Sequence, residues 1–183
     1  MNLANKITLV RIGLIPVFII LLHVYPTWMV EQFTVVQHIN EYGMLWAAGI
    51  FVLAASTDKL DGYVARKYNQ TTNLGKLLDP LADKLLISVA LIMLVQQHQI
   101  STWIAIAIIG REIIINGIRI LAAAKGVALA ADQYGKLKLV FQVIAIAICL
   151  VNEYLIYVIG GFPLAGILMI VAVLMTIYSG YNY

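Results

Sequence analysis

Two pairs of aspartates are the residues of this chain whose type and spacing could do chemistry. Asp58 and Asp61 are three positions apart, and Asp79 and Asp83 are four positions apart. On a helix, both spacings place the two side chains on one face. Mg²⁺ and Mn²⁺ prefer carboxylate oxygens, and two such ions roughly 3.5–4 Å apart would suit paired aspartates. The pairs predict a site for two divalent metal ions.

The two pairs differ in how well a structural role explains them. Asp79 precedes Pro80, a pattern typical of a helix N-cap followed by proline at the first helical position. Asp83 would then lie in the first turn, where the helix dipole favours an anion. Asp58 and Asp61 lie near the C-terminus of an expected helix, where the dipole disfavours them. Capping and metal binding both remain open for Asp79, whereas the first pair needs a cation.

Small residues and a cation follow the first pair on the same helical face. Gly62 and Ala65 each come four positions after an aspartate, and Arg66 comes one turn after Gly62. Small side chains let a ligand approach the helix backbone, and an arginine can meet a phosphate or a base. Metal ions with a nearby arginine are the parts that phosphoryl transfer needs.

Composition indicates that the elements carrying these residues are membrane helices. Hydrophobic residues make up 62% of the 183 residues and charged residues 11%, against about 25% charged in soluble domains. A helix that crosses a bilayer needs about 20 apolar residues. Six segments qualify: 8–30, 43–66, 79–97, 102–124, 136–152 and 157–179. We predict an all-α integral membrane protein with six transmembrane helices in one bundle, forming a single domain over 1–183.

Charge distribution predicts the orientation of these helices. An even number of spans places both termini on one side, and every Lys and Arg except Arg111 lies toward that side. The opposite connections, 31–42, 98–101 and 153–156, contain no Lys or Arg. Cytoplasmic loops are enriched in these residues. We therefore expect a multi-pass protein of the cell membrane, with both termini and the active site on the cytoplasmic side.

The aspartate segment resembles the signature of the CDP-alcohol phosphatidyltransferase family, D-x2-D-G-x2-A-R-x8-G-x3-D-x3-D. Every fixed position is met, by Asp58, Asp61, Gly62, Ala65, Arg66, Gly75, Asp79 and Asp83. The resemblance implies two divalent metals held by the four aspartates, with Asp83 also the general base. It further implies a cytidine diphosphate site lined by Asn5, Thr8, Gly62, Ala65, Arg66 and Gly75. Asn5 and Thr8 could equally cap the first helix.

A second set of polar residues indicates where the second substrate binds, the acceptor of the transferred group. Its cations are Arg111, Arg119, Lys136 and Lys138. We expect them to hold an anionic group such as a phosphate. Arg111 could instead form an ion pair with Glu112, and the two lysines could be interfacial anchors. The region resembles the branch of the family that uses glycerol 3-phosphate.

The reaction implied by the resemblance transfers a phosphatidyl group from CDP-diacylglycerol to glycerol 3-phosphate and releases CMP. The expected partners are these two substrates, membrane lipid and a second copy in a homodimer, with no nucleic acid. One alternative is a sister enzyme whose acceptor is inositol phosphate, inositol, serine or phosphatidylglycerol. Another is a cation or proton transporter, because intramembrane carboxylates often mark ion paths.

Overall fold

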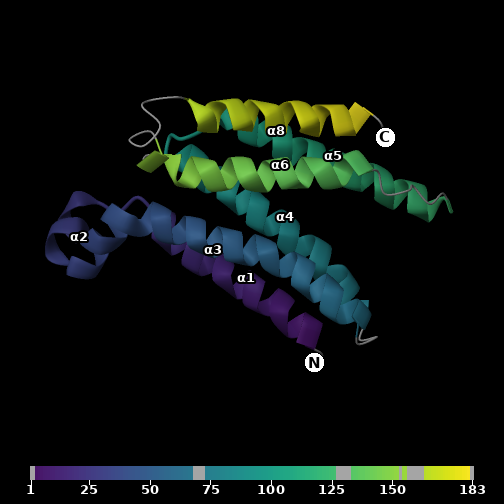
Figure 1. Cartoon of the computed structure of the whole chain (residues 1–183), viewed down its shortest axis with the longest axis horizontal. Helices are drawn as coiled ribbons and strands as arrows, with labels where there is room; N and C mark the ends of the chain where they lie inside the picture. Colours follow the sequence, from purple (N-terminus) through teal and green to yellow (C-terminus); the bar gives the residue numbers. More distant parts are fainter. Residues whose placement is uncertain (1–2, 68–72, 127–132, 153, 156–162, 182–183) are drawn as a thin grey trace. The chain divides into compact units, whose positions relative to one another are not determined.

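The computed structural model describes residues 3–67, 73–126, 133–152, 154–155 and 163–181. Within these ranges, the side chains of residues 3–5, 58–67, 73–80, 123, 133–136 and 181 are not described. The described residues form helices and contain no strand, as Figure 1 shows. The predicted all-α class is confirmed. The helices are α1 (Leu3–Leu22), α2 (Thr27–Gln32), α3 (Thr34–Lys67), α4 (Asn73–Gln96), α5 (Thr102–Ala124), α6 (Gln133–Leu150) and α8 (Leu164–Tyr181).

The first predicted helix, 8–30, is wrong at its C-terminal end. α1 ends at Leu22, and the short helix α2 begins at Thr27. Pro26 is the N-cap of α2, with φ −66° and ψ 147°, and a proline disfavours helical conformation in the residue before it. Carbonyls at a helix end lack an intrahelical donor. The side-chain amide of Gln97 donates to the Leu22 carbonyl at 2.7 Å.

The predicted connection at 31–42 is also wrong, because α3 begins at Thr34 and includes most of it. Hydropathy marks the part of a helix that suits lipid. The helix itself continues as long as each turn forms its backbone hydrogen bonds. Exposed polar residues such as Gln37 and Asn40 therefore lie on α3 and not in a loop.

The position at which α4 begins bears on the two structural roles considered for Asp79 and Asp83, helix capping and a place in the first turn. α4 begins at Asn73 and not at Asp79, so both Asp79 and Asp83 lie inside the helix. The N-cap interpretation of Asp79 and the first-turn interpretation of Asp83 are therefore wrong. The favourable effect of the helix dipole is confined to the first turn. Asp83 needs a different counter-charge.

The first compact unit, Met1–Gln97, contains α1 to α4. α1 packs against both α3 and α4, and Figure 1 shows it running beside α3. Phe18 of α1 and Phe51 of α3 are fully buried, with ring centroids 6.1 Å apart. A Cβ at Gly43 of α3 would collide with the backbone carbonyl of Leu21. Glycine at position 43 therefore permits the close approach of α1 and α3.

The second compact unit, His98–Tyr183, contains α5, α6 and α8. α8 packs against both α5 and α6. The core of the second unit includes Ile108 from α5, Ile146 from α6, and Met169 and Ala172 from α8, all at most 1% exposed. These helices carry the polar network described below.

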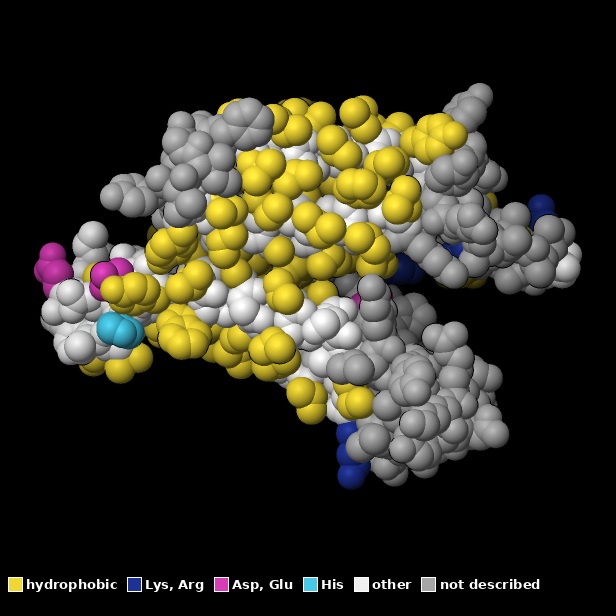
Figure 2. Space-filling model, in the orientation of Figure 1, with side chains coloured by type: hydrophobic (Ala, Val, Ile, Leu, Met, Phe, Trp, Pro, Cys, Tyr) yellow, Lys and Arg dark blue, Asp and Glu magenta, His cyan; other side chains and the backbone are white. Residues whose placement is uncertain are grey.

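Apolar side chains also cover the outside of the helices. Figure 2 shows hydrophobic side chains over most of the visible described surface, and residues as large as Leu53 and Ile120 are more than 60% exposed. Among the described residues, Thr34–Thr57 is the helical segment that is both long and apolar enough to cross a membrane. The apolar segments Leu137–Leu150 and Leu164–Gly180 are shorter.

Candidate active site

The structure places the predicted metal-binding aspartates on two helices of the first unit. Asp58 and Asp61 lie in the C-terminal part of α3, and Asp79 and Asp83 lie in α4. Asp83 is the member of this set whose side chain is described. The other three lie outside the described side chains, together with Asn5, Gly62, Ala65, Arg66, Gly75 and Lys136.

Asp83 is ion-paired with an arginine from another helix. Nη1 of Arg11, on α1, lies 3.1 Å from Oδ1 of Asp83. The Arg11 side chain is fully buried, whereas that of Asp83 is 22% exposed. Burying an unpaired charge in an apolar interior is very costly, so a buried arginine requires such a partner. The counter-charge of Asp83 is therefore a side chain of α1.

Arg11 also contacts α3. Its Nε donates a hydrogen bond of 3.3 Å to Oγ1 of Thr57, which in turn donates to the carbonyl of Ala54 at 2.7 Å. Thr57 is the residue directly before Asp58. One guanidinium thus joins α3 and α4, the two helices that carry the aspartates.

Thr8 lies one turn before Arg11 on α1 and is fully buried. Because α1 includes Leu3 to Leu22, Thr8 is inside the helix. The alternative that Thr8 caps this helix is wrong. Its predicted contact with the nucleotide stays a prediction.

The metal prediction stays a prediction, because Asp83 is the one predicted ligand whose side chain is described. No group of three or more His, Cys, Asp or Glu side chains that could hold a metal ion occurs among the described residues. Asp83 offers carboxylate oxygens, which are the donors that Mg²⁺ and Mn²⁺ prefer. Its partly exposed carboxylate fits this chemistry.

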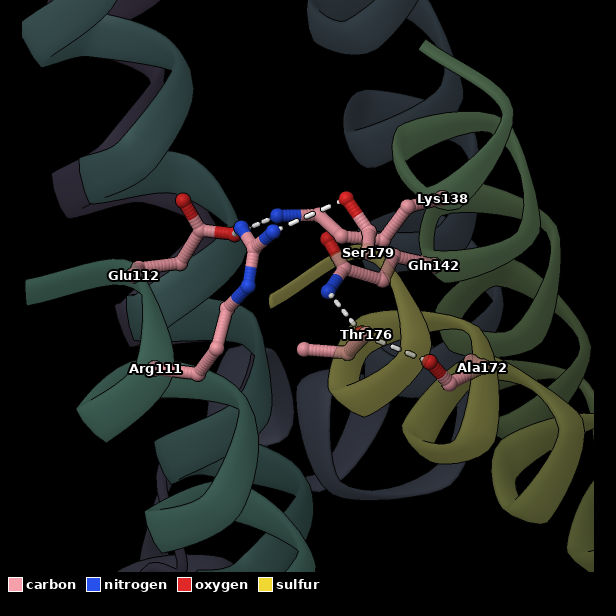
Figure 3. A network of polar contacts seen from close by, with 7 residues as sticks. All are labelled: Arg111, Glu112, Lys138, Gln142, Ala172, Thr176 and Ser179. Carbon is pink, nitrogen blue, oxygen red and sulfur yellow. Dashed lines mark hydrogen bonds and ion pairs between the residues drawn. The ribbon is translucent and has the colours of Figure 1, made fainter. Parts of the chain in front are cut away.

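A separate polar network lies inside the second unit, as Figure 3 shows. Nζ of Lys138, on α6, forms an ion pair with Oε1 of Glu112, on α5. Nη1 of Arg111 lies 3.6 Å from the same oxygen. The ion pair between Arg111 and Glu112, expected as one alternative for this arginine, is therefore present. Lys138 is 4% exposed, so it is not an interfacial anchor.

Residues of α8 complete this network. Nη2 of Arg111 donates to Oγ of Ser179 at 2.8 Å. Gln142 of α6 donates to the hydroxyl of Thr176 at 2.9 Å, and that hydroxyl donates to the carbonyl of Ala172. Figure 3 shows these side chains directed toward one another between the helices. The network thus fixes two of the predicted acceptor-binding cations.

Three of the four predicted acceptor residues have described side chains, and their role as phosphate ligands stays a prediction. Arg111 and Lys138 come together around Glu112. Arg119 is half-buried and lies farther along α5. The sequence analysis did not predict Arg11, Ser179 or Thr176 as site residues. These residues could have been found as cations or hydroxyls inside apolar segments, because a polar group in such a segment requires a partner.

Comparisons with known proteins agree with the resemblance seen in the aspartate segment. The model of the CDP-alcohol phosphatidyltransferase family matches residues 1–178. A protein of Bacillus subtilis (strain 168) is 43% identical over 182 residues, covering 100% of this chain and 93% of its own length. A protein of Rickettsia typhi is 34% identical, covering 100% and 94%, and one of Escherichia coli K12 is 38% identical, covering 80% and 75%. Each relative is named CDP-diacylglycerol–glycerol-3-phosphate 3-phosphatidyltransferase.

Proposed function

This chain belongs to the CDP-alcohol phosphatidyltransferase family, and we propose that it transfers the phosphatidyl group of CDP-diacylglycerol to sn-glycerol 3-phosphate. The products are phosphatidylglycerophosphate and CMP. The observation that carries the proposal is the 43% identity over the whole chain with a relative whose name states this donor and acceptor. The chain is accordingly an enzyme, a phosphotransferase of phospholipid biosynthesis.

The membrane setting follows from the family, which is membrane-associated. We propose six spans, with both termini and the active site on the cytoplasmic side of the cell membrane. The exposed apolar side chains on the described helices support this arrangement, as does the one-sided distribution of Lys and Arg along the sequence. CDP-diacylglycerol then reaches the site from the lipid with its acyl chains still in the bilayer.

Members of the family use divalent metals. In this chain, two Mg²⁺ or Mn²⁺ ions are proposed, with Asp58, Asp61, Asp79 and Asp83 as their ligands. Such ions bind pyrophosphate oxygens and stabilise the negative charge that develops on the leaving group. Asn5, Thr8, Gly62, Ala65, Arg66 and Gly75 are the proposed contacts of the cytidine diphosphate.

Asp83 is the proposed general base. It accepts the proton of the acceptor hydroxyl, whose oxygen attacks the lipid-side phosphorus. A phosphorus–oxygen bond forms to the glycerol oxygen, and the bond to the CMP oxygen breaks. The 22% exposure of the Asp83 side chain supports this role, because a base must be accessible to its substrate.

The proposed ligands of the acceptor phosphate are Arg111, Arg119, Lys136 and Lys138. Two of them share the single carboxylate of Glu112. A guanidinium and an ammonium group gathered at one carboxylate are the kind of cations that bind a phosphate. Their presence supports a phosphorylated acceptor over serine or inositol.

An acceptor panel tests the proposal. The purified protein is given CDP-diacylglycerol and Mg²⁺ with glycerol 3-phosphate, inositol phosphate, inositol, serine or phosphatidylglycerol, and both CMP and the lipid product are measured. We expect phosphatidylglycerophosphate with glycerol 3-phosphate and little CMP with the others. Faster turnover with any other acceptor would refute the acceptor assignment.

Light scattering of the detergent-solubilised protein tests the expected homodimer.

A further inference from the structure

Arg11 is a buried cation in a unit built mainly from apolar helices. The residue is 1% exposed, and its side chain is fully buried. An intramembrane charge of this kind is expensive and is usually retained for a function. The contacts of Arg11 indicate what that function is.

The guanidinium of Arg11 contacts two helices at once through two different nitrogens. Nη1 reaches Oδ1 of Asp83 on α4 at 3.1 Å, and Nε reaches Oγ1 of Thr57 on α3 at 3.3 Å. The planar guanidinium holds these donors at a fixed angle to each other, which an ammonium group cannot do. The arginine therefore sets the position of the Asp83 carboxylate relative to Thr57.

Thr57 is suited to be the fixed end of this contact. Its hydroxyl donates to the carbonyl of Ala54 one turn earlier in α3. The hydroxyl proton is thereby directed at the helix backbone, and a lone pair is available to accept from Arg11. Thr57 directly precedes Asp58, so the Arg11 contact reaches α3 next to the first proposed metal ligand.

We propose that Arg11 is a positioning residue for Asp83, holding its carboxylate at the place and angle that metal binding and proton acceptance require. The inference rests on the proposed function, because that function assigns Asp83 its role. A carboxylate has two oxygens with about four lone-pair positions, so an ion pair through Oδ1 is compatible with chemistry at the same group. Side chains that orient a metal ligand commonly change metal affinity or activity by about 10- to 100-fold when they are replaced.

Two substitutions remove the positioning without removing the charge. Arg11→Lys keeps the cation near Asp83 but loses the rigid, planar arrangement of donors that holds both contacts at once. Thr57→Val keeps the ion pair and the side-chain volume but removes the hydroxyl that holds Nε. Since both variants keep the positive charge of position 11, a change in Mn²⁺ affinity reports on carboxylate placement and not on net charge.

Two further variants are the matched controls. Thr57→Ser keeps a hydroxyl at position 57, in contrast to Thr57→Val. Lys6→Gln removes a cation from the same helix α1, where Lys6 is exposed. Both are expected to behave as the wild type.

The experiment compares all five proteins in detergent, by steady-state kinetics and by electron paramagnetic resonance titration with Mn²⁺ alone. We expect Arg11→Lys to lower kcat by roughly 10²-fold and to weaken Mn²⁺ binding by about 10-fold or more. Thr57→Val is expected to show the same two changes at about 5- to 10-fold. The KM for CDP-diacylglycerol should change by less than about twofold in each, because the lost contact acts on the carboxylate and not on ground-state binding.

Wild-type kcat and Mn²⁺ affinity in both Arg11→Lys and Thr57→Val would overturn the inference, even if their melting temperatures fell. The Mn²⁺ titration needs no acceptor, so it separates the inference from the acceptor assignment. If the wild type made no phosphatidylglycerophosphate but Arg11→Lys still weakened Mn²⁺ binding, the positioning role would be supported and the proposed reaction refuted. If the wild type made phosphatidylglycerophosphate normally and neither variant had an effect, the proposed reaction would be supported and the positioning role refuted.

Discussion

Lys138 of α6 and Glu112 of α5 form an ion pair inside the second unit, and Arg111 lies 3.6 Å from the same carboxylate oxygen. One acidic side chain therefore holds two of the cations proposed to bind the acceptor phosphate. Lys138 is buried, and a buried charge that loses its partner is strongly destabilising. Glu112 is thus expected to hold both cations in place before the substrate arrives.

Replacing Lys138 with Gln should raise the KM for glycerol 3-phosphate. A hydrogen bond to a charged group contributes about 1.5–3 kcal/mol, which corresponds to roughly a 10- to 150-fold change in apparent affinity. Steady-state kinetics with labelled glycerol 3-phosphate at saturating CDP-diacylglycerol measures this. Lys125→Gln, which removes an exposed cation of the same unit, should leave the KM unchanged. Equal KM values for the two variants would exclude Lys138 from the acceptor site.

Replacing Gly180 with Ala should shift the Arg111 side chain and so weaken the binding of glycerol 3-phosphate. A Cβ at this position would lie 3.3 Å from Nε of Arg111 and 3.5 Å from its Cγ. The arginine must then shift by a few tenths of an ångström while Ser179 still binds its Nη2. We expect a KM for glycerol 3-phosphate that is raised about 3- to 10-fold, equivalent to about 1 kcal/mol.

Gly166→Ala is the matched control for this substitution. Gly166 is on the same helix, and a Cβ there would meet nothing within 4 Å. Alanine favours a helix over glycine by about 1 kcal/mol at both positions, so the two variants share any gain in helix stability. A raised KM in both, or in neither, would contradict the proposed link between Gly180 and Arg111.

Replacing Gly43 with Ala should destabilise the first unit. The added Cβ would collide with the backbone carbonyl of Leu21, and a backbone atom cannot move away as a flexible side chain can. Overpacking of this kind costs about 1–3 kcal/mol. The melting temperature in detergent should fall, while Gly49→Ala on the same helix, where the new Cβ has open space, should match or exceed the wild type. A Gly43→Ala variant that melts like Gly49→Ala would show that α1 and α3 do not approach so closely.

Replacing Asp83 with Asn should lower kcat strongly while the protein stays folded. The amide oxygen can still accept a hydrogen bond from Arg11, but the side chain can no longer take the proton of the acceptor hydroxyl. General base catalysis contributes typically 10²–10⁴-fold, so kcat should fall by about that factor. Glu31→Gln, at an exposed acid of α2, is the control. Full activity of Asp83→Asn would refute the assignment of Asp83 as the base.

Removal of divalent metal ions should stop CMP release completely. The proposed site consists of oxygen ligands, which bind Mg²⁺ and Mn²⁺. Treatment with EDTA followed by addition of either ion should restore the rate, and the loss and recovery of CMP formation are followed directly. Activity that persists after exhaustive chelation would contradict metal-assisted transfer.

Hydropathy predicted most of the helices and failed at several of their ends. It predicted a connection at 31–42 and a helix start at Asp79, whereas α3 begins at Thr34 and α4 at Asn73. Apolar content measures how well a segment suits lipid, while a helix ends where capping and backbone hydrogen bonding end it. The wrong N-cap interpretation of Asp79 came from the Asp79-Pro80 pattern, which here lies inside α4.

The sequence by itself determined the aspartate spacing, the helical class and the family signature, because these depend on residues that are near one another in the chain. Only the tertiary structure decided which polar side chains meet. Arg11 finds its partners 46 and 72 positions away, on α3 and α4, and Arg111 finds Ser179 68 positions away. Helical periodicity defines the face of a single helix. The pairing of one face with another depends on how whole helices pack, which no local pattern encodes.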